Sequence, residues 1–138
     1  MRKIKVLYWI TTIIIFLFEG VAPALTSNSQ LAIDGIKHLG YPDYFRIMLT
    51  CFKVVGALIL ILPKAKGAIK EWAYAGFTFT MIAACVSHSS VDGISAQSLF
   101  PLIVLAILMT SYFSYKKIVA NQNVNSKSFK SKESVVLQ

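Results

Sequence analysis

Four long apolar runs, separated by short polar segments, make up most of the chain as far as residue 119. They cover residues 4–26, 44–62, 71–89 and 99–119. Each has about the 17–25 residues that a helix needs to cross a lipid bilayer. The runs are continuous rather than alternating, which favours helices over the strands of a membrane barrel. The pattern therefore predicts an all-α fold, a four-helix transmembrane bundle.

The first run has a second interpretation, a cleaved signal peptide. Residues 2–5 form a basic start, an apolar centre follows, and Ala22-Pro23-Ala24 resembles a cleavage site. Against this interpretation, Glu19 interrupts the approach to the cut and apolar residues resume after it. The spanning helix is our prediction, and the signal peptide stays open as the alternative.

Composition and charge agree with a membrane protein. The chain is 56% hydrophobic and only 14% charged, which is too apolar for an ordinary soluble domain. With four spans, eleven of the fourteen basic residues fall on the side that holds the amino terminus, the loop at 63–70 and the tail. Since basic loops mark the cytoplasmic face, both termini are predicted to be cytoplasmic. The net charge of +8 is then a topology signal, and no nucleic-acid partner is expected.

The last segment, residues 120–138, differs from the rest in composition. It is rich in Ser, Asn and Lys and poor in large apolar residues. Such a composition predicts a disordered basic cytoplasmic tail after a membrane domain that covers residues 1–119.

Five polar residues within or beside the runs are the strongest pointers to a site. They are Glu19, Arg46, Lys53, His88 and Asp92. A charge at membrane depth costs about 2.5–3.5 kcal/mol on insertion scales. At 1.5 Å of rise per residue, all five can lie in the outer half of the bilayer. One interpretation is a polar cavity open to the outside, in which Glu19 pairs with Lys53 or Arg46, and His88 with Asp92. The other is a structural Glu19–Lys53 pair, with the remaining three at the wet interface.

Small residues on the third run predict close helix packing. Gly76, Thr80 and Ala84 recur every four residues and end at His88. This spacing lets two helices approach each other closely. Gly56 in the second run is assigned the same packing role.

The sequence carries no motif for catalysis, nucleotide binding or metal ligation. His88 has no second ligand of comparable depth, because His38 falls in the first outer loop. Cys51 and Cys85 are interpreted as small buried apolar residues, with a redox pair as the alternative. No catalytic or metal-binding residue is therefore predicted.

Several short segments together resemble one known family. They are Glu19-Gly20, Leu39-Gly40-Tyr41-Pro42, Lys53-Val54-Val55-Gly56, Glu71-Trp72-Ala73-Tyr74-Ala75-Gly76-Phe77 and Ser87-His88. In these segments the chain resembles the DoxX-like family of small four-helix membrane proteins, over about residues 5–117. The resemblance implies a bundle in the cytoplasmic membrane, usually of a bacterium, and it establishes no catalytic residue.

Two functions follow as expectations. The first is an accessory or assembly subunit of a membrane complex, without catalytic activity of its own. The alternative is a quinone-linked redox or small-ligand-binding subunit with an outward-facing polar cavity; the quinone is implied only by the family resemblance. The expected partners are the lipid bilayer and either another membrane protein or a second copy of the chain.

Overall fold

The computed structural model describes residues 1–136 as a set of helices joined by short turns. No strand occurs within this described part, so the predicted all-α class is confirmed. The elements are α1 (Arg2–Ile15), the π-helix η1 (Phe16–Val21), α2 (Ala22–Thr26), α3 (Gln30–His38), α4 (Asp43–Ile61), α5 (Ala68–Asp92) and α6 (Ala96–Val136).

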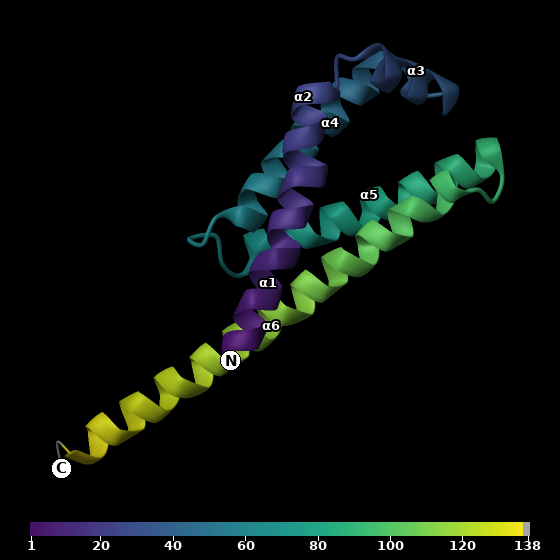
Figure 1. Ribbon diagram of the computed structural model, residues 1–138. Coiled ribbons are helices and arrows are strands. Elements are labelled where there is room, and N and C mark those ends of the chain that lie inside the picture. The colour runs from purple at the N-terminus through teal and green to yellow at the C-terminus, as the bar shows by residue number, and fades with distance from the viewer. Residues whose placement is uncertain (137–138) are drawn as a thin grey trace.

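The helices form two pairs that diverge from a common junction (Figure 1). The N-terminal pair consists of the continuous α1–η1–α2 rod and α4, and the C-terminal pair consists of α5 and α6. At the junction α1 packs on α6, and α4 packs on α5. The hydrophobic core lies there and includes Ile15, Ala57, Leu60, Phe77 and Leu108. Away from the junction the pairs separate, and the short helix α3 lies at the open end (Figure 1).

Three helical segments are long and apolar enough to cross a membrane: Arg2–Thr26, Asp43–Ile61 and Ala96–Glu133. They correspond to the first, second and fourth predicted spans. The third predicted span falls in α5, which has 25 residues but does not reach the same apolar standard. Its hydroxyl residues, His88 and terminal charges lower its hydropathy. Three of the four predicted spans thus coincide with helices that could cross a membrane by length and composition, and the four-helix transmembrane bundle is not confirmed.

Side-chain contacts place three separate parts of the chain at one end of the molecule. Asn121 Nδ2 lies 2.9 Å from Met1 Sδ, and the Gly67 N–H donates to the Tyr115 hydroxyl at 3.1 Å. The amino terminus, the 62–67 loop and the middle of α6 therefore meet at what we call the lysine-rich end. The α3 helix and the 93–95 turn lie at the opposite end (Figure 1). The long helices consequently alternate in direction.

The tail differs from its sequence prediction. Disorder is predicted for residues 120–138, whereas α6 continues to Val136 and projects beyond the other helices (Figure 1). Residues 120–133 are all exposed, so apart from the Asn121 contact with Met1 this part of the helix gains little from burial. Neither Gly nor Pro occurs after Pro101, and nothing in the sequence therefore interrupts the helix. Residues 137 and 138 of the predicted tail lie outside the described residues.

The π-helix η1 interrupts the first long rod and contains Glu19 and Gly20. Short π-helical turns within α-helices occur frequently at functional sites. A Cβ atom on Gly20 would lie 2.6 Å from the Cβ of Ala57 on α4. The missing side chain of Gly20 therefore allows the two helices to meet beside Glu19.

A hydroxyl network that the sequence did not reveal joins α1, α5 and α6. Ser111 Oγ lies 2.8 Å from Thr12 Oγ1 and 2.8 Å from the Tyr74 hydroxyl. All three side chains are almost completely buried. Because buried polar groups need partners, this network restricts how the three helices can pack.

Ser111→Ala is expected to destabilise the protein by about 1–2 kcal/mol, because Thr12 and Tyr74 lose a buried hydrogen-bond partner. Unfolding in detergent, followed by circular dichroism, measures the loss. Ser90→Ala is the matched control, since the exposed Ser90 hydroxyl donates only to Val86 of its own helix. Equal stability of the two variants would contradict the assignment.

Candidate functional site

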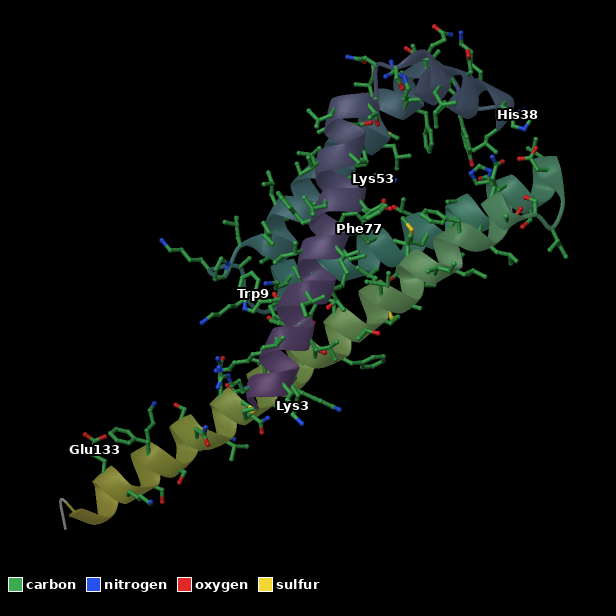
Figure 2. All side chains as sticks on the ribbon, viewed as in Figure 1. Lys3, Trp9, His38, Lys53, Phe77 and Glu133 are labelled. Carbon is green, nitrogen blue, oxygen red and sulfur yellow. The ribbon has the colours of Figure 1, made fainter. Side chains whose placement is uncertain are left out.

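The centre of the candidate site is an ion pair between Glu19 of η1 and Lys53 of α4. Lys53 Nζ lies 2.8 Å from Glu19 Oε2. Glu19 is only 7% exposed, and the Lys53 side chain is 20% exposed. Figure 2 shows Lys53 between the two helix pairs, on the open side of the junction marked by Phe77. Of the two acid–base pairings open from the sequence, the structure brings together Glu19 and Lys53.

Within residues 1–136, Glu19 Oε2 accepts no hydrogen bond of regular geometry. Its contact with Lys53 is thus an ion contact set by proximity and charge. Taking two charges out of water costs several kcal/mol per ion, and only a close partner offsets this. Each residue therefore depends on the other.

Arg46 does not join this pair. Its guanidinium is buried and contacts Asp43 Oδ1 at 2.9 Å and Asn28 Oδ1 at 3.0 Å, and it also donates to the Ser27 carbonyl. These partners lie at the start of α4 and in the turn between α2 and α3. Arg46 thus fastens that turn to α4.

His88 and Asp92 lie on the same face of α5. His38, which the sequence pattern places in the first outer loop, belongs to α3. His38 Nε2 lies 2.6 Å from Asp92 Oδ1, whereas His88 Nδ1 is 3.6 Å from Asp92 Oδ2, beyond hydrogen-bond range. The Tyr41 hydroxyl lies 2.7 Å from Ser87 Oγ. The two contacts tie α3 and the turn after it to the end of α5, where Figure 2 places His38.

Two sequence signals could have revealed α3. Ser29 caps the helix, its side chain accepting from the Ala32 N–H, and the basic residues Lys37 and His38 occupy the last turn. Both features are typical of helix ends. They predict a helix here, but not its contact with α5.

Acidification is expected to release α3 from α5. The hydrogen bond with His38 is the main reason why the pKa of the Asp92 carboxyl lies below its usual value. A carboxyl with a lowered pKa contributes stability above its unfolded value of about 3.9 and loses it as the pH falls through the folded value. Spin labels on Asp34→Cys and Ser90→Cys, with the native cysteines changed to Ser, should therefore separate below about pH 4. With Asp92→Asn, the two labels should be separated at every pH. A label-to-label distance that does not change with pH in the protein with native Asp92 would contradict the contact.

Three cavities meet at Lys53. We call the first, of about 420 Å³, the aromatic cavity; Phe52, Trp72 and Phe77 are among its walls. The apolar cavity, of about 300 Å³, lies along Phe45, Leu49 and Phe79. The donor cavity, also of about 300 Å³, includes Arg46, Lys53 and His88 in its lining. Lys53 is part of all three linings.

The predicted packing residues have different surroundings. A Cβ on Gly56 would lie 2.9 Å from the Phe77 ring, so α4 and α5 meet closely there. Gly76 has nothing within 4 Å of such an atom and lines the aromatic cavity instead. Thr80 and Ala84 line the apolar cavity. Of these four predicted packing residues, Gly56 therefore lies at a close helix contact, whereas Gly76, Thr80 and Ala84 line cavities.

Lys70 is a buried cation that the sequence analysis placed in a cytoplasmic loop. It is 2% exposed, and its Nζ lies 5.4 Å from the centre of the Tyr8 ring and 5.3 Å from that of Tyr115. The ammonium also donates to the Leu62 carbonyl at 3.4 Å. Aromatic faces attract cations, so Lys70 helps to hold α1, α5 and α6 together at the lysine-rich end.

Other reactive groups form no cluster in the described part of the chain. Cys51 and Cys85 are free thiols; Cys51 is exposed and Cys85 is only partly buried, so the interpretation of both as buried apolar residues is wrong. No group of three or more His, Cys, Asp or Glu side chains within residues 1–136 could hold a metal ion. The polar chemistry around the cavities therefore consists of ion pairs and hydrogen-bond donors.

Comparison with known proteins identifies one similarity. The sequence pattern of the DoxX-like family matches residues 8–111, which include Glu19, Lys53, His88 and Asp92. No curated protein and no solved structure matches the chain.

Proposed function

Because the chain belongs to the DoxX-like family, we propose that it is a membrane-embedded binding protein that takes one small amphipathic molecule into the cavities around Lys53. The family match and the three apolar helices make it an integral membrane protein. The proposal assigns the binding step to this chain and leaves any chemical conversion of the ligand to a partner.

The proposal includes α5 as a fourth membrane crossing. At 1.5 Å per residue, its 25 residues extend about 37 Å, more than the hydrocarbon thickness of about 30 Å. The helix runs beside α6 and exposes large apolar side chains at Trp72, Phe79, Ile82 and Val86. Its hydroxyl groups do not oppose insertion, since Thr78 and Thr80 donate to carbonyls of their own helix.

The distribution of lysines supports an orientation. Most basic residues lie at or beyond the lysine-rich end, which we assign to the cytoplasm together with both termini. The apolar and donor cavities then face the outer half of the bilayer, whereas the aromatic cavity, with Ile69 and Trp72 in its lining, extends toward the cytoplasmic side. Lys53 lies roughly 14 Å along α4 from Leu62. The family resemblance favours the cytoplasmic membrane of a bacterium.

The observation that carries the proposal is the position of Lys53. A lysine at membrane depth is costly unless its charge has a use or a partner. Glu19 supplies a partner, yet the ammonium has three donors and also borders all three cavities. Volumes of 300–420 Å³ lie at the lower end of the range for small-molecule sites, about 300–1,000 Å³. Apolar walls with a few donors suit a molecule such as a quinone, whose carbonyl oxygens accept hydrogen bonds.

The accessory-subunit role is the second candidate. The end of α6 beyond residue 120 is exposed and projects from the other helices, so it is available to a partner. In this role the protein would bring its bound molecule to a catalytic subunit. A stoichiometric membrane protein that remains bound during purification, and is lost on truncation after residue 120, would favour this role.

Purification in a mild detergent, solvent extraction and mass spectrometry test the binding function. We expect close to one amphipathic molecule per chain from the native protein, and much less from Phe79→Ala, which widens the apolar cavity. Phe113→Ala is the matched control, because Phe113 is an exposed ring on α6 outside the cavity linings. Empty extracts, together with no stabilisation by added short-chain quinone or other amphiphiles, would overturn the proposal.

A further inference from the structure

We infer that the bound molecule is a single-chain amphiphile with a carboxylate head, the head lying in the donor cavity and the chain in the apolar cavity. This inference rests on the proposed binding function and adds the chemical class of the ligand. It predicts a preference for an anion over a neutral molecule of the same shape.

The walls of the donor cavity are chemically one-sided. Arg46, Lys53 and His88 all line it, and no carboxylate belongs to its lining. Thr26, Ser27 and Thr50 complete its polar surface. The Thr26 and Thr50 hydroxyls donate to helix carbonyls, so their hydrogens are already used. Arg46 already donates to Asp43, Ser27 and Asn28, so it contributes mainly its charge. The remaining strong groups are the nitrogens of Lys53 and His88, which suit a head that only accepts hydrogen bonds.

Three acids stand outside that lining. Glu19 pairs with Lys53, Asp43 with Arg46, and Asp92 approaches His88. Glu19 and Asp43 offset the charges of Lys53 and Arg46, which lets the empty site exist at membrane depth. A carboxylate head would contact the cations from the open side, and the free donors of Lys53 can bind it without leaving Glu19.

The donor cavity continues into a place for an apolar chain. The donor and apolar cavities share Ile36, Leu39, Leu49 and Lys53 in their linings. Beyond these shared residues, the apolar cavity extends along Phe45, Phe79 and Ala83. A head at Lys53 therefore places its chain between α4 and α5, along these apolar side chains.

Competition for photo-cross-linking provides the test. The full-length protein in phosphatidylcholine nanodiscs is labelled with a dodecanoic acid that carries a diazirine, and the modified peptides are mapped by mass spectrometry. Dodecanoate, dodecanol and a short-chain quinone then compete, at concentrations corrected for partition into protein-free discs. We expect labelling on α4 and α5, and competition by dodecanoate about tenfold stronger than by dodecanol, as one charge-assisted hydrogen bond provides.

Two variants separate the role of the donors from folding. His88→Leu removes the ring nitrogens from the lining of the donor cavity, and Phe113→Ala, at an exposed ring on α6 outside the cavity linings, is the control. We expect His88→Leu to reduce the preference for dodecanoate and Phe113→Ala to retain it, with both proteins folded by circular dichroism. Equal competition by dodecanol or the quinone would overturn the carboxylate assignment and leave the binding function standing. Absence of site-specific labelling and of competition by all three compounds would overturn both.

Discussion

Lys53→Met is expected to destabilise the protein by about 3–5 kcal/mol, because it leaves Glu19 buried without a compensating charge. The loss arises mainly from the stranded carboxylate, since methionine fills nearly the same volume as the lysine stem. Chemical unfolding in detergent micelles measures it. Lys117→Met, at an exposed lysine on α6, is the matched control and should change stability little.

A double-mutant cycle shows whether the two residues act as a pair. Glu19→Gln with Lys53→Met removes both charges, so the double variant should recover much of the stability that Lys53→Met loses. Strictly additive losses would refute the coupling. A coupled result would leave the binding function open to its own tests, because stability and ligand affinity are measured separately.

Gly20→Leu is expected to cost about 3 kcal/mol, at the upper end of overpacking effects, because the new side chain has no space beside α4. The Cβ alone would lie 2.6 Å from the Ala57 Cβ, which is closer than such atoms approach in proteins. The displaced helix would also separate Glu19 from Lys53. Thermal unfolding in detergent and the yield of folded protein both report the loss.

Gly76→Leu is the matched control, since the same substitution there meets nothing within 4 Å of the new Cβ. This variant should retain the stability of the native protein. A loss of stability would instead indicate that the small-residue face of α5 is packed. Gly20→Ala combined with Ala57→Gly should recover part of the loss that Gly20→Ala causes, because the second change removes the opposing atom. Equal effects at Gly20 and Gly76 would contradict the close contact.

The Glu19–Lys53 pair and the close contact at Gly20 both depend on the same short segment. The π-helical turn carries both Glu19 and Gly20, so the same segment presents an acid to Lys53 and a bare backbone to Ala57. Because η1 and α4 approach each other closely, the Glu19 and Lys53 side chains can reach each other. This arrangement explains how a charged pair is held at membrane depth without further polar partners for Glu19 Oε2 within residues 1–136.

Sequence patterns identified the long helices because each reflects a local property. Apolar runs of membrane length predicted residues 4–26, 44–62 and 99–119 as spans, and helices of that kind occur at all three places. The third predicted span is not confirmed, because the mixed composition of α5 keeps it below the apolar standard of the other three, although its helix is present. The composition of the tail predicts disorder, whereas α6 continues to Val136, because low hydrophobicity argues against packing and not against an isolated helix.

The candidate site could be predicted only in part, because spacing along one helix says little about partners on another. The cost of charge in lipid singled out Glu19 and Lys53 and favoured their pairing, with Arg46 left open as an alternative partner for the acid. The structure resolves this choice by giving Arg46 its own acid, Asp43, one turn away. The contact between His38 and Asp92 was not predicted, because the two residues are 54 positions apart in the sequence.

The sequence by itself determined that the long apolar helices favour a lipid environment and which ionisable groups lie within or beside them. Hydrophobicity and charge are properties of single residues and short runs, so both can be read without the fold. Only the tertiary structure decided which groups meet. The divergence of the two helix pairs, the π-helical turn at Glu19 and the placement of α3 against α5 depend on contacts between distant segments. Those contacts depend on how surfaces fit in three dimensions, and no periodicity along the chain encodes that fit.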